Sequence, residues 1–352
     1  MRRASWADFS LLLVLVLAST AEGQVRYQPT DLGRIEGNST DAKGINDPSH
    51  VVGSSSASAE TALPALLWTQ SSGVHHLDTL GGGNSSGQGA SDGSQVVGYA
   101  DTTDGGSHAF IYTKATGMRD LGTLGGSNSQ ANAINSDEDT DGPNQIAGWS
   151  LVSEDTAQHA VVWDGNHKIL DLGTLGGTNS QAYGVNCDGV VVGSSGTADD
   201  ATTDAFVWDR EFGMQDLGTL GGSFGQSNAI NCSGTIVGMS SLAGDAQIDA
   251  FLYADGTMRD LGNLGGSFSQ ANAINDSGDV VGSANTTGDT DVHAFLWTPK
   301  GGLQDLNNLI PTDLGWDLNS ANGINEAGKI VGVGTINGEG HAFALIPVDT
   351  ED

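Results

Sequence analysis

This chain of 352 residues is poor in cysteine, basic residues and long apolar runs, and each shortage excludes a class of protein. Two cysteines, Cys187 and Cys232, are too few for a fold framed by disulfides. Twelve Lys and Arg against 43 Asp and Glu give a net charge of −31. Because such a surface repels nucleic acid and anionic membranes, we expect no nucleic-acid partner. Cation binding and a saline habitat both account for this acidity, and the sequence does not separate them.

The one long apolar run, Leu11 to Leu17, lies near the N-terminus behind Arg2 and Arg3. This order, followed by small residues, predicts a signal peptide over residues 1–23. The run is shorter than the ~20 residues that a membrane-spanning helix needs. We therefore expect a secreted protein, extracellular or periplasmic, with no membrane insertion. Export permits a Cys187–Cys232 disulfide, but equivalent turns of adjacent repeats are expected to lie beyond the ~7 Å that a bridge allows, which weighs against one.

What the chain has in abundance is glycine, 53 residues, and repetition. The Leu of an element that reads Asp-Leu-Gly in five of its copies recurs at positions 32, 77, 121, 172, 217, 261 and 306. The spacings are therefore 45, 44, 51, 45, 44 and 45 residues. A period of this size indicates a repeat architecture, in which no single unit buries its apolar face alone.

Alternating apolar and polar residues, interrupted by turn residues, predict four short antiparallel strands in each repeat. That is the size of a β-propeller blade. Residues 27–32 match only a fourth strand, and the last repeat stops after its third. We therefore predict an all-β, seven-bladed propeller over residues 24–348, closed by its N-terminal strand, monomeric, with a polar tail at 349–352. An open solenoid and two smaller sheets are the alternatives.

The repeats resemble the secreted HAF family, which is named for a His-Ala-Phe motif. That motif occurs at 108–110, 293–295 and 341–343, and Asp-Leu-Gly-Thr-Leu-Gly-Gly occurs at 120–126, 171–177 and 216–222. The closing stretch, with Gly315-Trp316 and Gly328-Lys329-Ile330-Val331-Gly332, also matches. The resemblance spans residues 27–347 and implies an exported repeat protein without an agreed activity. The first repeat departs from it, with Pro64-Ala65-Leu66 in place of the motif.

An insertion in the third repeat resembles the start of a calcium loop. Asp137, Asp139, Asp141 and Gly142 follow the Asp-x-Asp-x-Asp-Gly pattern, with Gln145 where another Asp is usual. Because calcium takes six to eight oxygen ligands, alternating carboxylates on a bent loop predict a structural calcium site. A solvated acidic loop is the alternative.

Two series recur once per repeat and are interpreted as structural. The histidines at 108, 159, 293 and 341 exchange with Asp204 and Asp249 in two repeats, so we expect them to bond local backbone rather than to converge on a metal. The aromatic series is expected to pack between blades, at positions 68, 112, 163, 208, 253 and 297.

Candidate ligand contacts are the residues that break the symmetry. Trp316 lies in a loop found only in the last repeat, where covering the closure seam is the alternative role. Lys43 and Tyr183 stand where other innermost strands carry an amide: Gln88, Asn132, Asn228, Asn272 and Asn322. Hydrogen bonding between blades is the alternative for this whole polar collar.

No catalytic constellation is recognisable, so the sequence favours an exported binding module for carbohydrate or protein rather than an enzyme. One alternative is a hydrolase or lyase of polysaccharide or ester that uses Glu36 with Lys43 or Tyr183. The other is a cell-surface structural protein. Seven near-equivalent loops would favour a binding module or a structural protein, whereas an asymmetric concave pocket would favour an enzyme.

Overall fold

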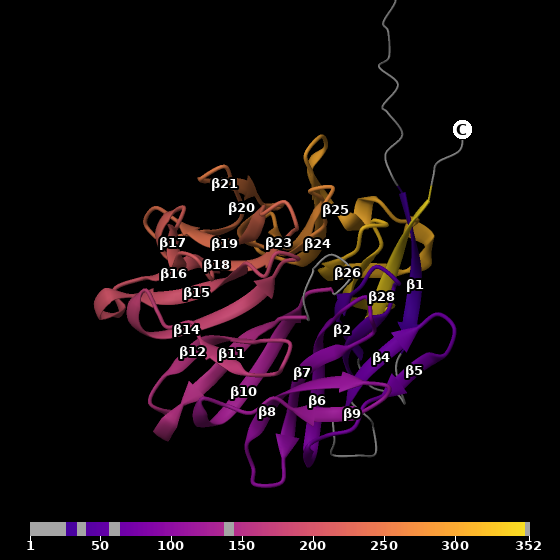
Figure 1. Ribbon diagram of the computed structural model, residues 1–352. Helices are drawn as coiled ribbons and strands as arrows, with labels where there is room; N and C mark the ends of the chain where they lie inside the picture. Colours follow the sequence, from indigo (N-terminus) through magenta and orange to yellow (C-terminus); the bar gives the residue numbers. More distant parts are fainter. Residues whose placement is uncertain (1–25, 34–39, 56–63, 137–143, 349–352) are drawn as a thin grey trace, which may run out of the picture.

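The computed structural model describes residues 26–33, 40–55, 64–136 and 144–348, which form strands joined by tight turns (Figure 1). Consecutive strands pair antiparallel in units of four. The first three units consist of β2 (Thr40–Ile45), β3 (Val51–Ser55), β4 (Ala65–Thr69) and β5 (Gly73–His76); β6 (Gly81–Ala90), β7 (Val96–Thr102), β8 (Ser107–Thr113) and β9 (Gly117–Asp120); and β10 (Gly125–Ile134), β11 (Ile146–Val152), β12 (Gln158–Trp163) and β13 (Ile169–Asp171).

The remaining units follow the same order. They consist of β14 (Gly176–Val185), β15 (Val191–Thr197), β16 (Thr203–Asp209) and β17 (Gly213–Gly218); β18 (Gly221–Ile230), β19 (Ile236–Leu242), β20 (Ile248–Ala254) and β21 (Thr257–Gly262); β22 (Gly265–Ile274), β23 (Val280–Thr286), β24 (Val292–Thr298) and β25 (Gly302–Asp305); and β26 (Trp316–Ile324), β27 (Ile330–Ile336) and β28 (Glu339–Val348) with β1 (Arg26–Gly33). Short 3-10 turns lie between strands: η3 (Ser153–Asp155), η4 (Ala198–Asp200), η5 (Leu306–Asn308) and η6 (Thr312–Leu314).

The sheet of β26, β27 and β28 takes its fourth strand from the other end of the chain. β1 pairs antiparallel with β28, with Tyr27 opposite Pro347. The carboxylate of Asp31 in β1 lies 3.0 Å from Nδ1 of His341 in β28. The two ends of the described chain therefore lie side by side, as Figure 1 shows.

The units pack through the apolar faces of their middle strands. The Ala of the His-Ala-Phe position and the Val-Val pair of the second strand are fully or almost fully buried in unit after unit, for example Ala205, Val191 and Val192. The recurring aromatics pack as the sequence predicts: Trp163 is fully buried, and its Nε1 donates to the Leu121 carbonyl of the preceding unit at 2.9 Å. The core is therefore a series of layers between adjacent units.

Glycine in the Val-Val-Gly element is required by close approach of two strands. A Cβ built on Gly193 in β15 would lie 2.0 Å from the carbonyl oxygen of Gln181 in β14. The pairing of these strands shifts register between Ala182 and Gly184, so a β-bulge brings the two backbones together here.

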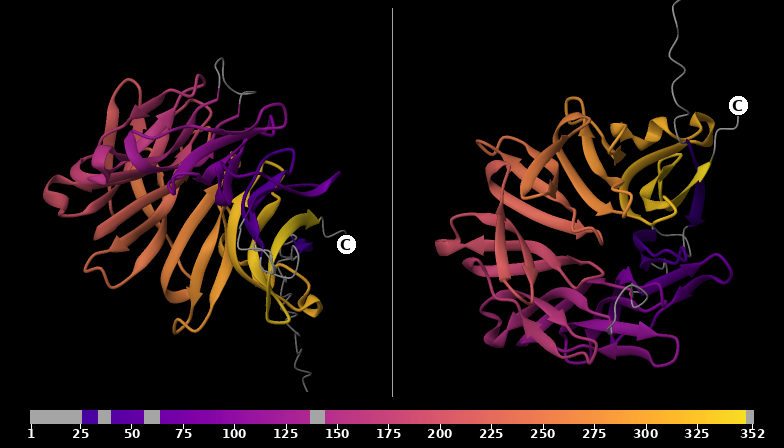
Figure 2. Two further views of the ribbon diagram at one scale, coloured as in Figure 1. Left: turned by 90° about the horizontal axis from the view of Figure 1, so that it is seen from below. Right: turned by 45° about the horizontal axis from the view of Figure 1, so that its top comes forward.

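The first strands of the units surround a common axis (Figure 2) and are joined there by side-chain amides. Asn186 Nδ2 donates to the Asn231 carbonyl at 3.2 Å, and Asn231 Nδ2 donates to the Asn275 carbonyl at 3.1 Å. The series continues from the last unit to the first, where Asn325 Nδ2 donates to the Asn46 carbonyl at 3.1 Å.

The predicted signal peptide (1–23) and polar tail (349–352) lie outside the described residues. Within the described part of the chain, no helix has the length and hydropathy of a membrane span.

Candidate functional site in the central channel

At one end of the channel, the residue at the β-bulge of each first strand faces a polar hollow of about 330 Å³. Lys43 and Tyr183, which the sequence singles out, both line it. The other lining residues are amides: Gln88, Asn132, Gln226, Asn228, Gln270, Asn272 and Asn322. We call these nine residues the collar. The sequence pattern does not single out Gln226 and Gln270, although each lies two residues before a collar Asn and donates to its side-chain oxygen.

The collar amides hold one another and the neighbouring unit. Gln226 Nε2 donates to Asn228 Oδ1 at 2.7 Å, and Asn228 Nδ2 donates to the Ala271 carbonyl of the next unit at 2.7 Å. An amide group has two N–H donors and an oxygen with two lone pairs. The orientation of each collar Asn is therefore fixed by one N–H donor and one lone pair of its oxygen. The second N–H and the second lone pair remain able to hydrogen-bond a ligand in the channel.

Lys43 and Tyr183 give the collar its asymmetry. Lys43 Nζ lies 2.6 Å from Oδ2 of Asp41, so its charge is compensated within its own strand. Burial raises the pKa of the Tyr183 hydroxyl, and a hydrogen bond with Ser194 opposes that rise. Tyr183 is therefore a neutral phenol at ordinary pH and supplies an aromatic ring among amides.

The other channel mouth is acidic, with a hollow of about 410 Å³ that includes Asp47, Asp92, Asp276 and Glu326. Each carboxylate accepts a backbone N–H from the preceding unit. Asp47 N donates to Asp92 Oδ1 at 3.0 Å, and Asp276 N donates to Glu326 Oε1 at 2.9 Å. Glu326 N donates to Asp47 Oδ1 at 2.9 Å, which carries the series from the last unit to the first. Burial and then the charge of Asp276 raise the pKa of Glu326.

Cys187 and Cys232 form a disulfide at this acidic mouth, with their Cα atoms 5.4 Å apart. The expectation that equivalent turns lie too far apart is therefore wrong. These turns lie next to the axis, where adjacent units are closest, and the same turns are joined by hydrogen bonds elsewhere round the mouth. The disulfide takes the place of one carboxylate contact in that series.

Trp316 does not line the collar in the described structure. Its ring packs edge-on against His341 and Phe343, with centroids 6.2 and 6.0 Å away. It adds to the apolar cluster under the last unit, beside Leu318. Glu36, the proposed acid of the enzyme alternative, lies outside the described residues.

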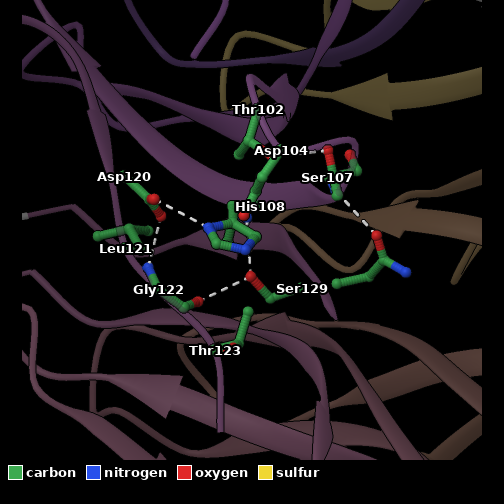
Figure 3. A network of polar contacts seen from close by, with 12 residues as sticks. Thr102, Asp104, Ser107, His108, Asp120, Leu121, Gly122, Thr123 and Ser129 are labelled. Atoms are coloured by element: carbon green, nitrogen blue, oxygen red, sulfur yellow. Dashed lines mark hydrogen bonds and ion pairs between the residues drawn. The ribbon is translucent and has the colours of Figure 1, made fainter. Parts of the chain in front are cut away.

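The recurring histidines hold carboxylates rather than backbone. His108 Nδ1 lies 2.8 Å from Asp120 Oδ2, and Asp120 Oδ1 accepts the Gly122 N–H at 2.7 Å (Figure 3). Ser129 of the next unit then bonds the Gly122 carbonyl at 2.7 Å and accepts the Ala109 N–H at 2.9 Å. The His therefore belongs to a network that fixes the linker between units, and the expected structural role holds with a different partner.

The loops after the second strands repeat one arrangement in four consecutive units. In the third unit, the Asp155 carboxylate accepts the N–H and hydroxyl of Ser127 at 2.7 and 2.8 Å. These bonds lower the pKa of Asp155. The equivalent aspartates, whose pKa values are lowered by the same kind of bond, are Asp200, Asp245 and Asp289.

The predicted calcium loop lies mostly outside the described residues, which exclude Asp137, Asp139 and Asp141. Two residues that follow it are described: Asn144 Oδ1 and Gln145 Oε1 are buried oxygens with no hydrogen-bond partner among the described residues. Asn144 is only 8% exposed, and its Nδ2 donates to Gln95 Oε1 at 2.9 Å. Elsewhere in the described ranges, His, Cys, Asp and Glu side chains form no group of three that could hold a metal.

No protein-family model and no curated protein matches the sequence. Similar solved structures include acylaminoacyl peptidase from Pyrococcus horikoshii, with a TM-score of 0.55, 11% identity and coverage of 90% of this chain and 52% of that one. Oligogalacturonate lyase from Vibrio parahaemolyticus has a TM-score of 0.52, 9% identity and coverage of 93% and 94%. This chain spans about half the length of the peptidase.

At these identities the likeness shows the fold alone. The chain is an all-β protein whose structural neighbours are β-propellers. Among the similar structures is also the β-propeller domain of the trilobed protease from Pyrococcus furiosus, with a TM-score of 0.49, 11% identity and coverage of 75% and 82%.

Proposed function

We propose that this protein is an exported β-propeller of seven blades, closed by β1, that binds neutral carbohydrate in the collar. The observation that carries the proposal is a concave hollow lined by seven amides, one phenol and one compensated cation. Its volume of about 330 Å³ lies within the range of ligand pockets.

The chemistry of the collar supports a neutral, hydroxyl-rich ligand. A sugar hydroxyl both donates and accepts, and so does an amide, whose two kinds of atom are held here at fixed positions. The ring of Tyr183 supplies the apolar face against which a sugar ring packs. A polyanion is disfavoured, because the chain carries a net charge of −31 and Asp41 already compensates Lys43.

The proposal is tested by titrating the protein with gluco- and manno-oligosaccharides, from monosaccharide to hexasaccharide, in a calorimeter. Tyr183→Asn puts the residue of other units in the collar and should weaken binding about tenfold, since it removes the aromatic contact. Lys114→Asn, in an exposed turn, is the control and should bind as the wild type does. Absence of binding by the wild type to the whole panel would overturn the proposal.

The second candidate is a hydrolase or lyase, and the similar structures favour it over the binding module. Two similar structures with TM-scores above 0.5 are enzymes by title, a peptidase and a lyase. Tyr183 and Lys43 are the groups in the collar that could move a proton. Release by the wild type of new reducing ends from neutral polysaccharide, or of unsaturated products from a uronate-containing one, with loss in Tyr183→Phe, would establish this candidate. Binding without turnover would exclude it for those polysaccharides.

We also propose that calcium stabilises the third unit through the insertion before Asn144. The unpartnered oxygens of Asn144 and Gln145 support this, because calcium takes amide as well as carboxylate oxygens. Asp139→Ala should abolish a calcium-dependent rise in the melting temperature. Equal melting of the wild type in calcium and in chelator would overturn the site.

A further inference from the structure

A third polar hollow, of about 410 Å³, opens on the fourth unit. It lies where β14, β15 and β16 approach their loops, with one side chain from β12 of the preceding unit. Every lining residue is polar or glycine: Gln158, Asn179, Ser180, Gln181, Ser194, Ser195, Gly196, Asp200 and Thr203. We call it the side hollow.

The side hollow exists because the fourth unit carries two small residues, Ser194 and Gly196, where the preceding unit carries two large ones. Ser194 pairs with Gln181 across β14 and β15, and Trp149 holds the equivalent position in the third unit, paired with Gln130. Gly196 stands where the third unit has Leu151. The sixth unit also has a serine, Ser283, at the first of these positions, but it has Asn285 at the second, so the fourth unit alone of these units lacks side-chain volume at both.

The polar groups of the side hollow are held in place by one another. Gln158 Nε2 donates to Gln181 Oε1 at 3.1 Å, and the Gln158 N–H donates to Asn179 Oδ1 at 2.9 Å. The Asp200 carboxylate is fixed by the N–H and hydroxyl of Thr178 at 2.7 and 2.6 Å. Amide, hydroxyl and carboxylate atoms are thus presented at fixed positions, as hydroxyl recognition requires.

The side hollow adjoins the collar through Tyr183. Gln181 and Tyr183 are two apart on β14, and the equivalent pair of the fifth unit, Gln226 and Asn228, is joined by a hydrogen bond, so both side chains leave the same face of the strand. Ser194, which lines the side hollow, hydrogen-bonds the Tyr183 hydroxyl. Tyr183 is therefore the partition between the two hollows, with its ring in the collar and its hydroxyl toward the side hollow.

We infer that the side hollow is a second subsite of the same site, which receives the sugar residue next to the one held in the collar. This inference rests on the proposed carbohydrate-binding function and adds to it that the ligand is an oligosaccharide of at least two units. Tyr183 contacts both residues, so it sets the angle between them.

The test fills the side hollow with a side chain that another unit already carries at the same place. Gly196→Asn introduces the residue that the sixth unit carries there, Asn285, whose Nδ2 donates to Asp289 Oδ1 at 3.0 Å. A Cβ at Gly196 would lie 2.7 Å from Asp200 Oδ1, so the side chain of Asp200 must shift to admit it. Thr335→Asn makes the same change at the equivalent position of the seventh unit and is the matched control. Gln158→Ala removes an amide from the side hollow without filling it.

Calorimetry with the same panel of gluco- and manno-oligosaccharides separates the outcomes. We expect Gly196→Asn to bind monosaccharide as the wild type does and longer chains about tenfold more weakly, with a smaller loss in Gln158→Ala. Tyr183→Asn should weaken binding at every length. If the affinity of Gly196→Asn rises with oligosaccharide length as that of the wild type does, and its melting temperature is unchanged, the second subsite alone would be overturned. No binding by the wild type would overturn it together with the proposed function.

Discussion

At the scale of residues, two units carry an aspartate in place of the histidine that holds the Asp of the linker in four other units. Asp204 and Asp249 replace it, so two carboxyl groups face each other in each unit. Burial raises the pKa of Asp204, and the charge of Asp216 adds to the rise. Burial raises the pKa of Asp260 as well, with a further contribution from the charge of Asp249. These two units therefore lose stability as pH rises to neutrality, because both carboxyl groups become ionised and repel each other. In the units with a histidine, the same position forms a stabilising His–Asp contact.

We predict that Asp204→His stabilises the protein at neutral pH by about 0.5 kcal/mol, because it restores a His–Asp pair that is partly exposed to solvent. The gain should appear as a rise in the urea midpoint at pH 7. It should vanish below about pH 4, where Asp204 of the wild type is protonated and no longer repels Asp216. Asp255→His, in an exposed turn, is the control, and an equal gain there would contradict the explanation.

At the scale of elements, the innermost turns form a chain of contacts round the acidic mouth, with one covalent member. The disulfide joins the fourth and fifth units and encloses a loop of 45 residues. The neighbouring contacts are single hydrogen bonds from backbone to carboxylate, such as Cys232 N to Asp276 Oδ1 at 2.8 Å. A covalent link here restricts the unfolded chain more than any of these bonds does.

We predict that replacing both Cys187 and Cys232 by Ser lowers the free energy of unfolding by about 4 kcal/mol, the loop entropy of a closure of this length. Reducing agent should lower the melting temperature of the wild type and leave that of the double variant unchanged. Asp276→Ala, which removes one hydrogen bond of the same series, should cost about 1 kcal/mol. A double variant no less stable than Asp276→Ala would contradict the prediction.

Local sequence predicts the strands well because period, turn residues and paired glycines act within each repeat. It also places Lys43 and Tyr183 together at the channel, since equivalent positions of a repeat lie at equal radius. It does not predict the disulfide, because the distance between Cys187 and Cys232 depends on how tightly the innermost turns approach the axis. The side hollow is invisible for a similar reason: Ser194 and Gly196 are unremarkable alone and matter only beside Gln158 of another unit.

At the scale of the molecule, two kinds of carboxyl group have opposite effects on how the free energy of unfolding changes with pH. The aspartates of the repeated loops, such as Asp155 and Asp289, have lowered pKa values because backbone and hydroxyl groups donate to them. Their stabilisation is present above the ordinary carboxyl pKa of about 4 and is lost as pH falls below it. Asp279 and Glu326 have pKa values raised by burial, so their cost grows as pH rises above their ordinary values.

We therefore predict that the free energy of unfolding is greatest in the mildly acidic range, because the net charge of −31 adds a repulsion that also grows toward neutrality. Urea unfolding at a series of pH values from strongly acidic to neutral measures it. Asp279→Asn should flatten the decline toward neutral pH, and Asp289→Asn should flatten the decline on the acid side. A stability that rises steadily to neutral pH would contradict the assignment.

We predict that deleting residues 24–33 destabilises the whole protein, because β28 then has an unpaired edge and His341 loses Asp31. A loss of several kcal/mol is expected, and self-association through the exposed edge should follow. Asp31→Ala leaves the strand in place, removes the contact with His341 and the hydrogen bond from the Gly33 N–H, and should cost about 1 kcal/mol. A truncated protein that melts as the wild type does would contradict the role of β1.

The pairing of β1 with β28 also orders events in time. Asp31 and His341 are separated by 310 positions, so the strand that is synthesised first has no partner until the strand synthesised last exists. The units between them are built from local hairpins and form as they emerge, whereas the last unit waits for the complete chain. Any nascent chain that ends before β28 therefore leaves β1 without its partner strand. A protease or chaperone can distinguish this unpaired strand from the paired one of the complete protein.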